Sequence, residues 1–150
     1  MVGEKSKTPK RELRLMVEEM ILKIDHIGVV VRDIEEALKV YRDVLGLKVS
    51  HVEVMEEAKV KLAFLPVGEV MIELLEPTDG EIGEFLEREG EGFHHIAFKV
   101  ENIREMLSRL KEAGIKLQDE EPRKGSRGTL IAFLDPESTM GIRIELVQES

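Results

Sequence analysis

Apolar residues recur along this chain with two periods, and the order of those periods is the same in both halves. Residues 24–31 form a β-branched apolar run, which is typical of a buried strand. Ile34, Leu38 and Tyr41 then follow at helical spacing. Three further strand-length runs lie near 47–54, 59–66 and 69–76. The first half therefore predicts the order βαβββ.

The second half of the chain repeats this order. Residues 93–117 (FHHIAFKVENIREMLSRLKEAGIKL) resemble residues 24–49 (IDHIGVVVRDIEEALKVYRDVLGLKV), with His95 matched to His26 and one residue dropped before the glycine. The likeness continues from AFLP (63–66) to AFLD (132–135) and from IELL (72–75) to IELV (144–147). We expect matching strands near 115–120, 128–134 and 142–148. A repeat of roughly seventy residues marks a duplicated module.

Both predicted helices carry the same start signal. Asp33 precedes the first helix and Asn102 the second, and each is followed three residues later by a glutamate, Glu36 or Glu105. This is the spacing of a capping box, in which the side chain of the first residue accepts a backbone N–H of the first turn. We therefore predict an α+β fold built from two tandem βαβββ modules.

The remaining segments set the domain boundaries. Residues 77–92 contain apolar residues at short helical spacing and form the linker between module one (23–76) and module two (93–148). We expect residues 23–150 to form a single domain, since a chain of 150 residues suits one core. Residues 1–22 form a leader in which Leu13, Met16, Val17 and Met20 keep helical spacing, so an extra N-terminal helix is expected. Met16 and Met20 are alternative starts of the chain.

Composition excludes several classes of function. The chain has no cysteine, which excludes disulfides, zinc thiolate sites and cysteine nucleophiles. The net charge of −9 argues against binding nucleic acid through its phosphates. No apolar run reaches the length of a membrane span or a signal peptide, so we expect a cytoplasmic protein. A charged fraction of 35% without Cys or Trp fits a thermophile.

Any metal must then be held by His, Asp and Glu, and strand alternation separates the histidines. On the first strand His26 shares a face with Gly28, and on the fifth strand His95 shares a face with Ala97. His94 is then expected on the opposite face, toward a helix, as a core residue or one that supports a ligand. His51 has no counterpart in the second module and is expected on the surface.

Two glutamates occupy matching positions inside apolar runs. Glu73 lies within IELL and Glu145 within IELV, and an unpaired charge is costly to bury in such a run. If the modules pair about a pseudo-twofold axis, His26, Glu73, His95 and Glu145 converge on one point. Such a set suits a divalent cation such as Mn, Co, Ni or Zn. A lone structural histidine and a solvent-facing strand glutamate are the alternatives, which the duplication disfavours.

These residues carry a family resemblance. DHI at the first strand, HHIA at the fifth and IEL at the fourth and eighth resemble the vicinal oxygen chelate superfamily. The resemblance implies a mixed sheet that curls into a cup around a divalent metal. Within the superfamily, residues 22–148 are most similar to the methylmalonyl-CoA epimerases, with markers in IELLEP (72–77), GEGFHHIAF (90–98), EPRKGSRG (121–128) and FLDPESTMGIRIELVQ (133–148).

The resemblance implies a metal-dependent isomerase that interconverts (R)- and (S)-methylmalonyl-CoA through an enolate, and a homodimer. By similarity His26, Glu73, His95 and Glu145 are the metal ligands, and Glu145 is also one catalytic base. Some bacterial epimerases carry a glutamate in the third strand, where this alignment has Lys61. Three alternatives stay open for the second group: Glu73, Lys61, or an alignment out of register.

The basic loop PRKGSRG (122–128) is the candidate binding site for the phosphates of coenzyme A. By similarity Arg123, Lys124 and Arg127, with the free backbone amides around the glycines, would meet these phosphates. The alternative is a solvated basic hairpin without a ligand.

Other functions of the same fold are open. A glyoxalase I-type lyase uses the same ligand types, although the segment DPESTMGIRIEL is longer than the usual turn of those enzymes. A metal-free binding protein of this fold relies on an aromatic cleft, and this chain has only five Phe, one Tyr and no Trp. A ring-opening dioxygenase would use two histidines and one carboxylate, which leaves one glutamate unexplained.

Overall fold

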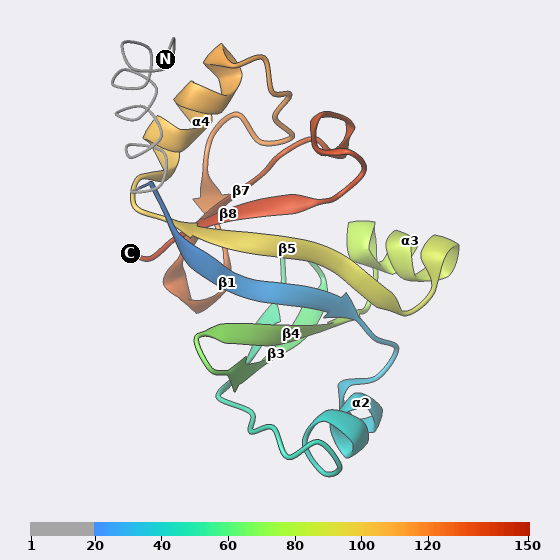
Figure 1. The fold of residues 1–150 in the computed structure, drawn as a ribbon. Coiled ribbons are helices and arrows are strands. Elements are labelled where there is room, and N and C mark those ends of the chain that lie inside the picture. The colour runs from blue at the N-terminus through green and yellow to red at the C-terminus, as the bar shows by residue number, and fades with distance from the viewer. Residues whose placement is uncertain (1–19) are drawn as a thin grey trace, which may run out of the picture.

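Strand pairing joins two βαβββ units into one eight-stranded sheet (Figure 1). The computed structural model describes residues 20–150. Its elements are β1 (Ile21–Val30), α2 (Ile34–Tyr41), β2 (His51–Met55), β3 (Val60–Val67), β4 (Val70–Pro77), α3 (Gly80–Glu89), β5 (Gly92–Val100), α4 (Ile103–Glu112), β6 (Arg123–Lys124), η1 (Ser126–Gly128), β7 (Leu130–Phe133), η2 (Pro136–Thr139) and β8 (Ile144–Gln148).

The sheet is symmetric about its central pair of strands. Its order is β2-β3-β4-β1-β5-β8-β7-β6, with β1 parallel to β4, β5 parallel to β8, and β1 antiparallel to β5. In the central pair His26 lies opposite Ala97, and Gly28 lies opposite His95. Exchanging the two modules therefore exchanges the two histidines, as the repeat predicted.

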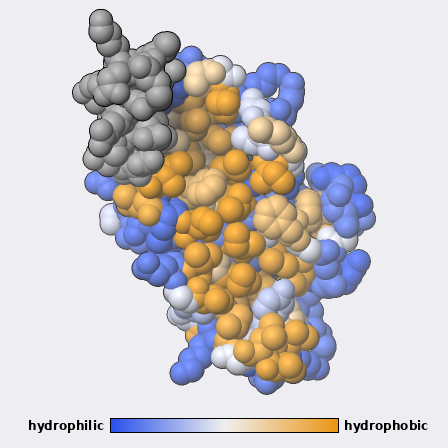
Figure 2. Space-filling view, viewed as in Figure 1, coloured by the Kyte–Doolittle hydropathy of each residue, from blue (hydrophilic) through white to orange (hydrophobic). Residues whose placement is uncertain are grey.

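Helices α2 and α4 pack against the outer face of the sheet at its two ends and leave its central strands uncovered (Figure 1 and Figure 2). Helix α2 packs on a cluster around Ile34, Leu38 and Leu65, and α4 packs on a cluster around Ile103 and Leu107. A third cluster, which includes Phe64 of β3 and Phe85 of α3, lies on the inner face of the cup. Apolar burial on both sides of the strands fixes the positions of the residues that point into the cup.

The caps predicted for the two main helices are present. The Asp33 side chain accepts the N–H groups of Glu35 and Glu36, and the Asn102 side chain accepts the N–H of Glu105. These bonds satisfy N–H groups that the first helical turn leaves without a partner.

A β-bulge precedes each central histidine. The register passes from Ile24 to His26 on β1 without a partner for Asp25, and on β5 it passes from Phe93 to His95 without a partner for His94. The extra residue of a bulge breaks the strict alternation of faces. Asp25 and His94 can therefore lie on the same side of the sheet as the histidines that follow them.

The predicted fold class is confirmed, with one local error. Residues 115–120 do not form the expected strand: Leu117 makes a single bridge to Leu134, and a short strand occurs instead at Arg123–Lys124. Here the N–H groups of Gln118 and Asp119 both bond to the carbonyl of Phe133, which stops a regular ladder. The expected N-terminal helix lies outside the described residues. Between residues 20 and 150, no helix has the length and apolarity needed to cross a bilayer.

Candidate metal centre

Four side chains from the four central strands meet at one point in the cup. They are His26 of β1, Glu73 of β4, His95 of β5 and Glu145 of β8, and all four are buried. The two Nε2 atoms are 3.1 Å apart. Glu145 Oε1 lies 2.9 Å from Nε2 of His26 and 3.2 Å from Nε2 of His95. Glu73 Oε1 lies 3.4 and 3.3 Å from the same two atoms.

The cluster fits a divalent cation. Ligand atoms bound to one cation at about 2.1 Å lie about 3.0–3.4 Å from one another, which matches the observed spacing. Oε1 of Glu73 and Oε1 of Glu145 are buried and have no hydrogen-bond partner. Buried polar atoms are rarely left without a partner, so these two oxygens indicate a missing positive group. His26, Glu73 and His95 alone already satisfy the spacing of a metal site.

The charges of the cluster point to the same requirement. Burial lowers the pKa of His26, but Glu73, Asp25 and Glu145 outweigh it and raise the pKa to about 10. Burial also acts against protonation of His95, and the two glutamates again raise its pKa. For Glu145 burial raises the pKa, whereas the two histidine rings beside it, when protonated, lower it. Without a metal the site therefore holds protons as its positive charge, and a bound cation would displace them.

Each of the two central histidines is held by the bulged residue before it. Asp25 Oδ2 lies 2.7 Å from Nδ1 of His26. His94 Nδ1 lies 2.8 Å from Nδ1 of His95, and the His94 ring stands edge-on to Phe85. Burial and the neighbouring charges of His95 and Arg143 lower the pKa of His94 to about 3, so His94 is neutral and can accept the Nδ1–H of His95. Both ligand rings then present Nε2 to the centre.

His94 lines the cup together with His95, so the prediction that the two residues lie on opposite faces of β5 is wrong; the helix that His94 contacts is α3 on the inner face, through Phe85. Strict alternation would have placed it on the outer face, but the bulge at His94 turns its side chain inward. Its expected part in supporting a ligand remains a prediction, now with a specific contact.

Gly28 provides the space that His95 occupies. A Cβ at Gly28 would lie 2.8 Å from Nε2 of His95 and still closer to Cε1 and Nδ1 of the same ring. His95 lies directly across the strand pair from Gly28. The glycine is therefore required by close packing against the imidazole.

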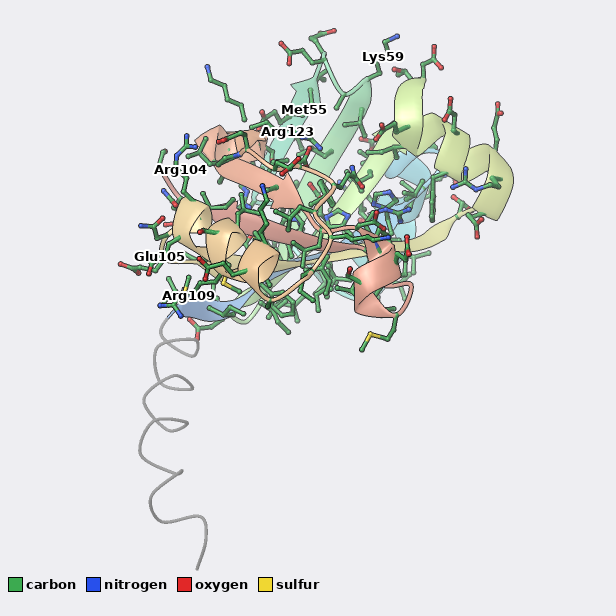
Figure 3. The ribbon with its side chains drawn as sticks, turned by 90° about the horizontal axis from the view of Figure 1, so that it is seen from above. Met55, Lys59, Arg104, Glu105, Arg109 and Arg123 are labelled. Atoms are coloured by element: carbon green, nitrogen blue, oxygen red, sulfur yellow. The ribbon has the colours of Figure 1, made fainter. Side chains whose placement is uncertain are left out.

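The cluster opens into a cavity of about 1000 Å³. Glu73, His95 and Glu145 lie in its wall, as do Phe85 and Phe133. Five cationic side chains also line it: Lys59, Arg88, Arg123, Lys124 and Arg143. In Figure 3, Met55 and Arg123 lie near the top of the view, between Lys59 on one side and Arg104 of α4 on the other. An anionic ligand with one end at the cluster would meet these cations.

Two predicted site residues do not reach the cavity. Lys61 lies between Val60 and Leu62, which both line the cavity, so its side chain leaves the opposite face of β3. Lys61 is therefore withdrawn as a catalytic group, which leaves Glu73 or an alignment out of register as the alternatives for the second group. Arg123 and Lys124 line the cavity as expected, whereas Arg127 turns inward and bonds to Asp25 at 2.6 Å.

Arg143 was not predicted as a site residue, whereas His51 lies on the surface strand as predicted. Arg143 lines the cavity, donates from Nη1 to the carbonyl oxygen of His94 at 3.0 Å and lies over Phe85. Its counterpart in the repeat is Met71, so comparison of the two modules gave no signal for it. His51 is on β2, partly exposed and paired with Glu53 at 2.8 Å.

Comparison with known proteins agrees with this geometry. The family model of the glyoxalase/bleomycin resistance protein/dioxygenase superfamily matches residues 25–133. The chain is 37% identical to the ethylmalonyl-CoA/methylmalonyl-CoA epimerase of Cereibacter sphaeroides, over 86% of this chain and 99% of that protein. It is 36% identical to the mitochondrial methylmalonyl-CoA epimerase of Mus musculus, over 84% of this chain and 72% of that protein. A variant of Streptomyces coelicolor methylmalonyl-CoA epimerase in complex with 2-nitronate-propionyl-CoA superposes with a TM-score of 0.83, at 37% identity, covering 87% of this chain and 96% of that one.

Proposed function

The chain belongs to the glyoxalase/bleomycin resistance protein/dioxygenase superfamily, and we propose that it is a metal-dependent epimerase that interconverts (R)- and (S)-methylmalonyl-CoA. The observation that carries the proposal is the buried set of two histidines and two glutamates that opens into a cavity lined by both cationic and acidic side chains. The names of the relatives supply the substrate class, an acyl-CoA.

His26, Glu73, His95 and Glu145 would hold the cation through the two Nε2 atoms and the two Oε1 atoms. When bound, a divalent cation would stabilise the negative charge that develops on the thioester and carboxylate oxygens of the substrate when the proton leaves C2. The three buried carboxylates of the region, those of Asp25, Glu73 and Glu145, would otherwise repel the free carboxylate of the methylmalonyl group.

Inversion at C2 requires proton transfer on two faces of one carbon, and the symmetry of the sheet supplies two carboxylates. Glu145 comes from β8 and Glu73 from β4, and these strands flank the central pair on opposite sides. Glu145 is the candidate for one of the two groups, because its carboxylate lies at the cluster where the acyl end of the substrate would bind. We assign Glu145 to one face and Glu73 to the other, since Lys61 points away.

The cationic side chains in the cavity wall suit the phosphates of coenzyme A. Arg123 and Lys124 are exposed and line the cavity together with Lys59, Arg88 and Arg143. Guanidinium and ammonium groups are the usual partners of phosphate in proteins. We therefore propose that the acyl end of the substrate enters toward Glu73 and Glu145 while its phosphates stay among these side chains.

We also propose that two copies associate through the outer face of the sheet. Figure 2 shows apolar side chains gathered over the central strands. On this face Ile27 lies opposite Ile96 at the internal pseudo-twofold axis, and Phe93 is 49% exposed. An apolar face with its own near-twofold symmetry suits a self-complementary contact. Analytical ultracentrifugation should show a dimer for the wild type and a monomer for Phe93→Glu, and a monomeric wild type would contradict this assignment.

The test of the activity is direct epimerisation. The metal-loaded protein is incubated with (S)-methylmalonyl-CoA and the formation of the (R)-isomer is followed by chiral analysis. The hemithioacetal of methylglyoxal and glutathione is offered in parallel, since a glyoxalase-type lyase would convert it. We expect epimerisation and no lyase activity. Lyase turnover without epimerisation would refute the proposal.

A further inference from the structure

Three carboxylates are buried in one small region of the cup. Asp25 is 2% exposed, Glu73 5% and Glu145 6%. Buried charges are tolerated only when they are paired. A divalent cation at the cluster would neutralise two of the three negative charges. The third requires a further positive group, and the structure contains one in Arg127.

Arg127 is joined to a proposed metal ligand through a single oxygen atom. Its Nη2 donates to Asp25 Oδ2 at 2.6 Å, and the same oxygen accepts the Nδ1–H of His26 at 2.7 Å. The guanidinium also lies 4.4 Å from the centre of the Phe64 ring, and Phe64 stands edge-on to His26. Arg127 therefore reaches His26 by two routes, one polar and one through packing.

The backbone of Arg127 is held in a conformation that few residues adopt. Its φ is +55° and its ψ is 26°, in the left-handed region that favours glycine. The backbone N–H of Arg127 donates to Glu53 Oε1 at 3.0 Å, which ties this turn of module two to β2 of module one. A residue with a side chain persists in this region only when surrounding contacts hold it there.

The two modules differ in the charge of the residue that contacts the central histidine, and they differ accordingly at the position of Arg127. The ligand histidine of module one has an anionic partner, Asp25, whereas that of module two has a neutral one, His94. The repeat, with AFLP matched to AFLD, equates Arg127 with Ala58. Module two therefore has a guanidinium where it meets the anionic Asp25 of module one, whereas module one has only Ala58 at the equivalent position.

We propose that Arg127 is a positioning residue of the metal centre, which holds Asp25 against His26 and supplies the positive charge that the divalent cation does not. This inference rests on the proposed metal site and replaces the expectation that Arg127 binds substrate phosphate. It also makes His26, a ligand from module one, depend on a turn of module two.

The test compares Arg127→Gln with Arg104→Gln, which removes an exposed arginine that pairs with Glu121 on the surface. Mn²⁺ affinity is measured by isothermal titration calorimetry without substrate. Loss of a group that orients a metal ligand typically weakens binding by about 10- to 100-fold. We expect that loss for Arg127→Gln, and none for Arg104→Gln. An affinity for Arg127→Gln within about twofold of the control would overturn the proposal.

A second comparison asks whether Arg127 acts through Asp25. In the Asp25→Asn background, Arg127→Gln should change Mn²⁺ affinity by less than about twofold, because the bridging charge is already gone. A full further loss in that background would overturn the mechanism. If Arg127→Gln alone does not fold, the Asp25→Asn/Arg127→Gln double variant also removes the charge of the carboxylate that Arg127 pairs with, and wild-type Mn²⁺ affinity in it would equally refute the proposal.

An NMR signal provides a readout that general stability does not move. The Nδ1–H proton of His26 should shift in Arg127→Gln and stay unchanged in Arg104→Gln, and an unshifted resonance would contradict the contact. Failure of the wild type to bind Mn²⁺ would refute the metal site of the proposed function. Equal binding by the wild type and Arg127→Gln would refute only the part assigned to Arg127.

Discussion

Adding one methyl group at Gly28 should disable the metal centre. The Cβ of Gly28→Ala would lie 2.8 Å from Nε2 of His95 and closer still to Cε1 and Nδ1, well inside van der Waals contact. The ring cannot simply retreat, because His94 holds its Nδ1 at 2.8 Å and Phe133 stands edge-on to it. Any movement that relieves the overlap therefore withdraws Nε2 from the other three ligand atoms.

The size of the effect follows from the cost of overpacking. Inserting a methyl group into a well-packed site typically costs about 1–3 kcal/mol. If that cost is paid when the metal-binding geometry forms, affinity falls by roughly 5- to 150-fold, because 1.4 kcal/mol corresponds to tenfold. Mn²⁺ affinity by calorimetry and the Tm of the metal-free protein together measure how this free-energy cost is divided between metal binding and folding.

Gly83→Ala is the matched control. Gly83 lies inside α3, and a Cβ there would meet only Cβ of Pro77 at 3.9 Å, an ordinary contact. Alanine is favoured over glycine in a helix, so this variant should keep its metal affinity and gain slightly in Tm. Equal Mn²⁺ affinity for Gly28→Ala and Gly83→Ala would refute the packing argument for His95.

Three further predictions test the charges and the support of the site. His95→Ala should purify with little divalent metal and His51→Ala with as much as the wild type, by elemental analysis; unchanged content in His95→Ala would exclude it as a ligand. The carboxylates around His26 outweigh burial and raise its pKa in the folded state to about 10, above the usual 6.5. Protonated His26 therefore stabilises the metal-free fold fully below pH 6.5, and this contribution is lost as the pH rises to about 10. The Tm of the metal-free protein should therefore fall over that window, and saturating Mn²⁺ should reduce the fall; a Tm independent of pH would contradict the charge argument. His94→Phe keeps an aromatic ring against Phe85 but removes the partner of His95 Nδ1, so Mn²⁺ affinity should drop by about tenfold or more, and retained affinity would show that the contact has no role in orienting the ligand.

The duplication made the centre of the sheet predictable from the sequence. A pair of histidines and a pair of glutamates at matching positions must be related by the symmetry that pairs the modules, and the structure brings all four together. Strand alternation chose His95 over His94 correctly. The same rule gave the wrong face for His94, because a bulge depends on how β1 and β5 pair, and no pattern along one strand records it.

Features that occur in only one module could not be predicted by comparing the two modules. Lys61 lies one position away from residues that face the cup, and only the pairing of β3 with β4 fixes that register. Arg127 was correctly placed on a basic turn, but its direction depends on Asp25, which is 102 residues away in the chain. Arg143 has an apolar counterpart, so its place in the cavity wall required the three-dimensional structure.

The central claim is that Glu145 and Glu73 move a proton at C2 of an acyl-CoA beside a bound cation. Its most direct test is the incorporation of deuterium from D₂O into C2 of methylmalonyl-CoA, followed by mass spectrometry, for the Mn²⁺-loaded wild type and Glu145→Gln. With the wild type we predict complete exchange of both the (R)- and the (S)-isomer. With the variant we predict at least about a hundredfold slower exchange of the one isomer whose proton Glu145 removes, since Glu73 still serves the other face. No exchange with the metal-loaded wild type, or equal rates for both proteins with each isomer, would contradict the account.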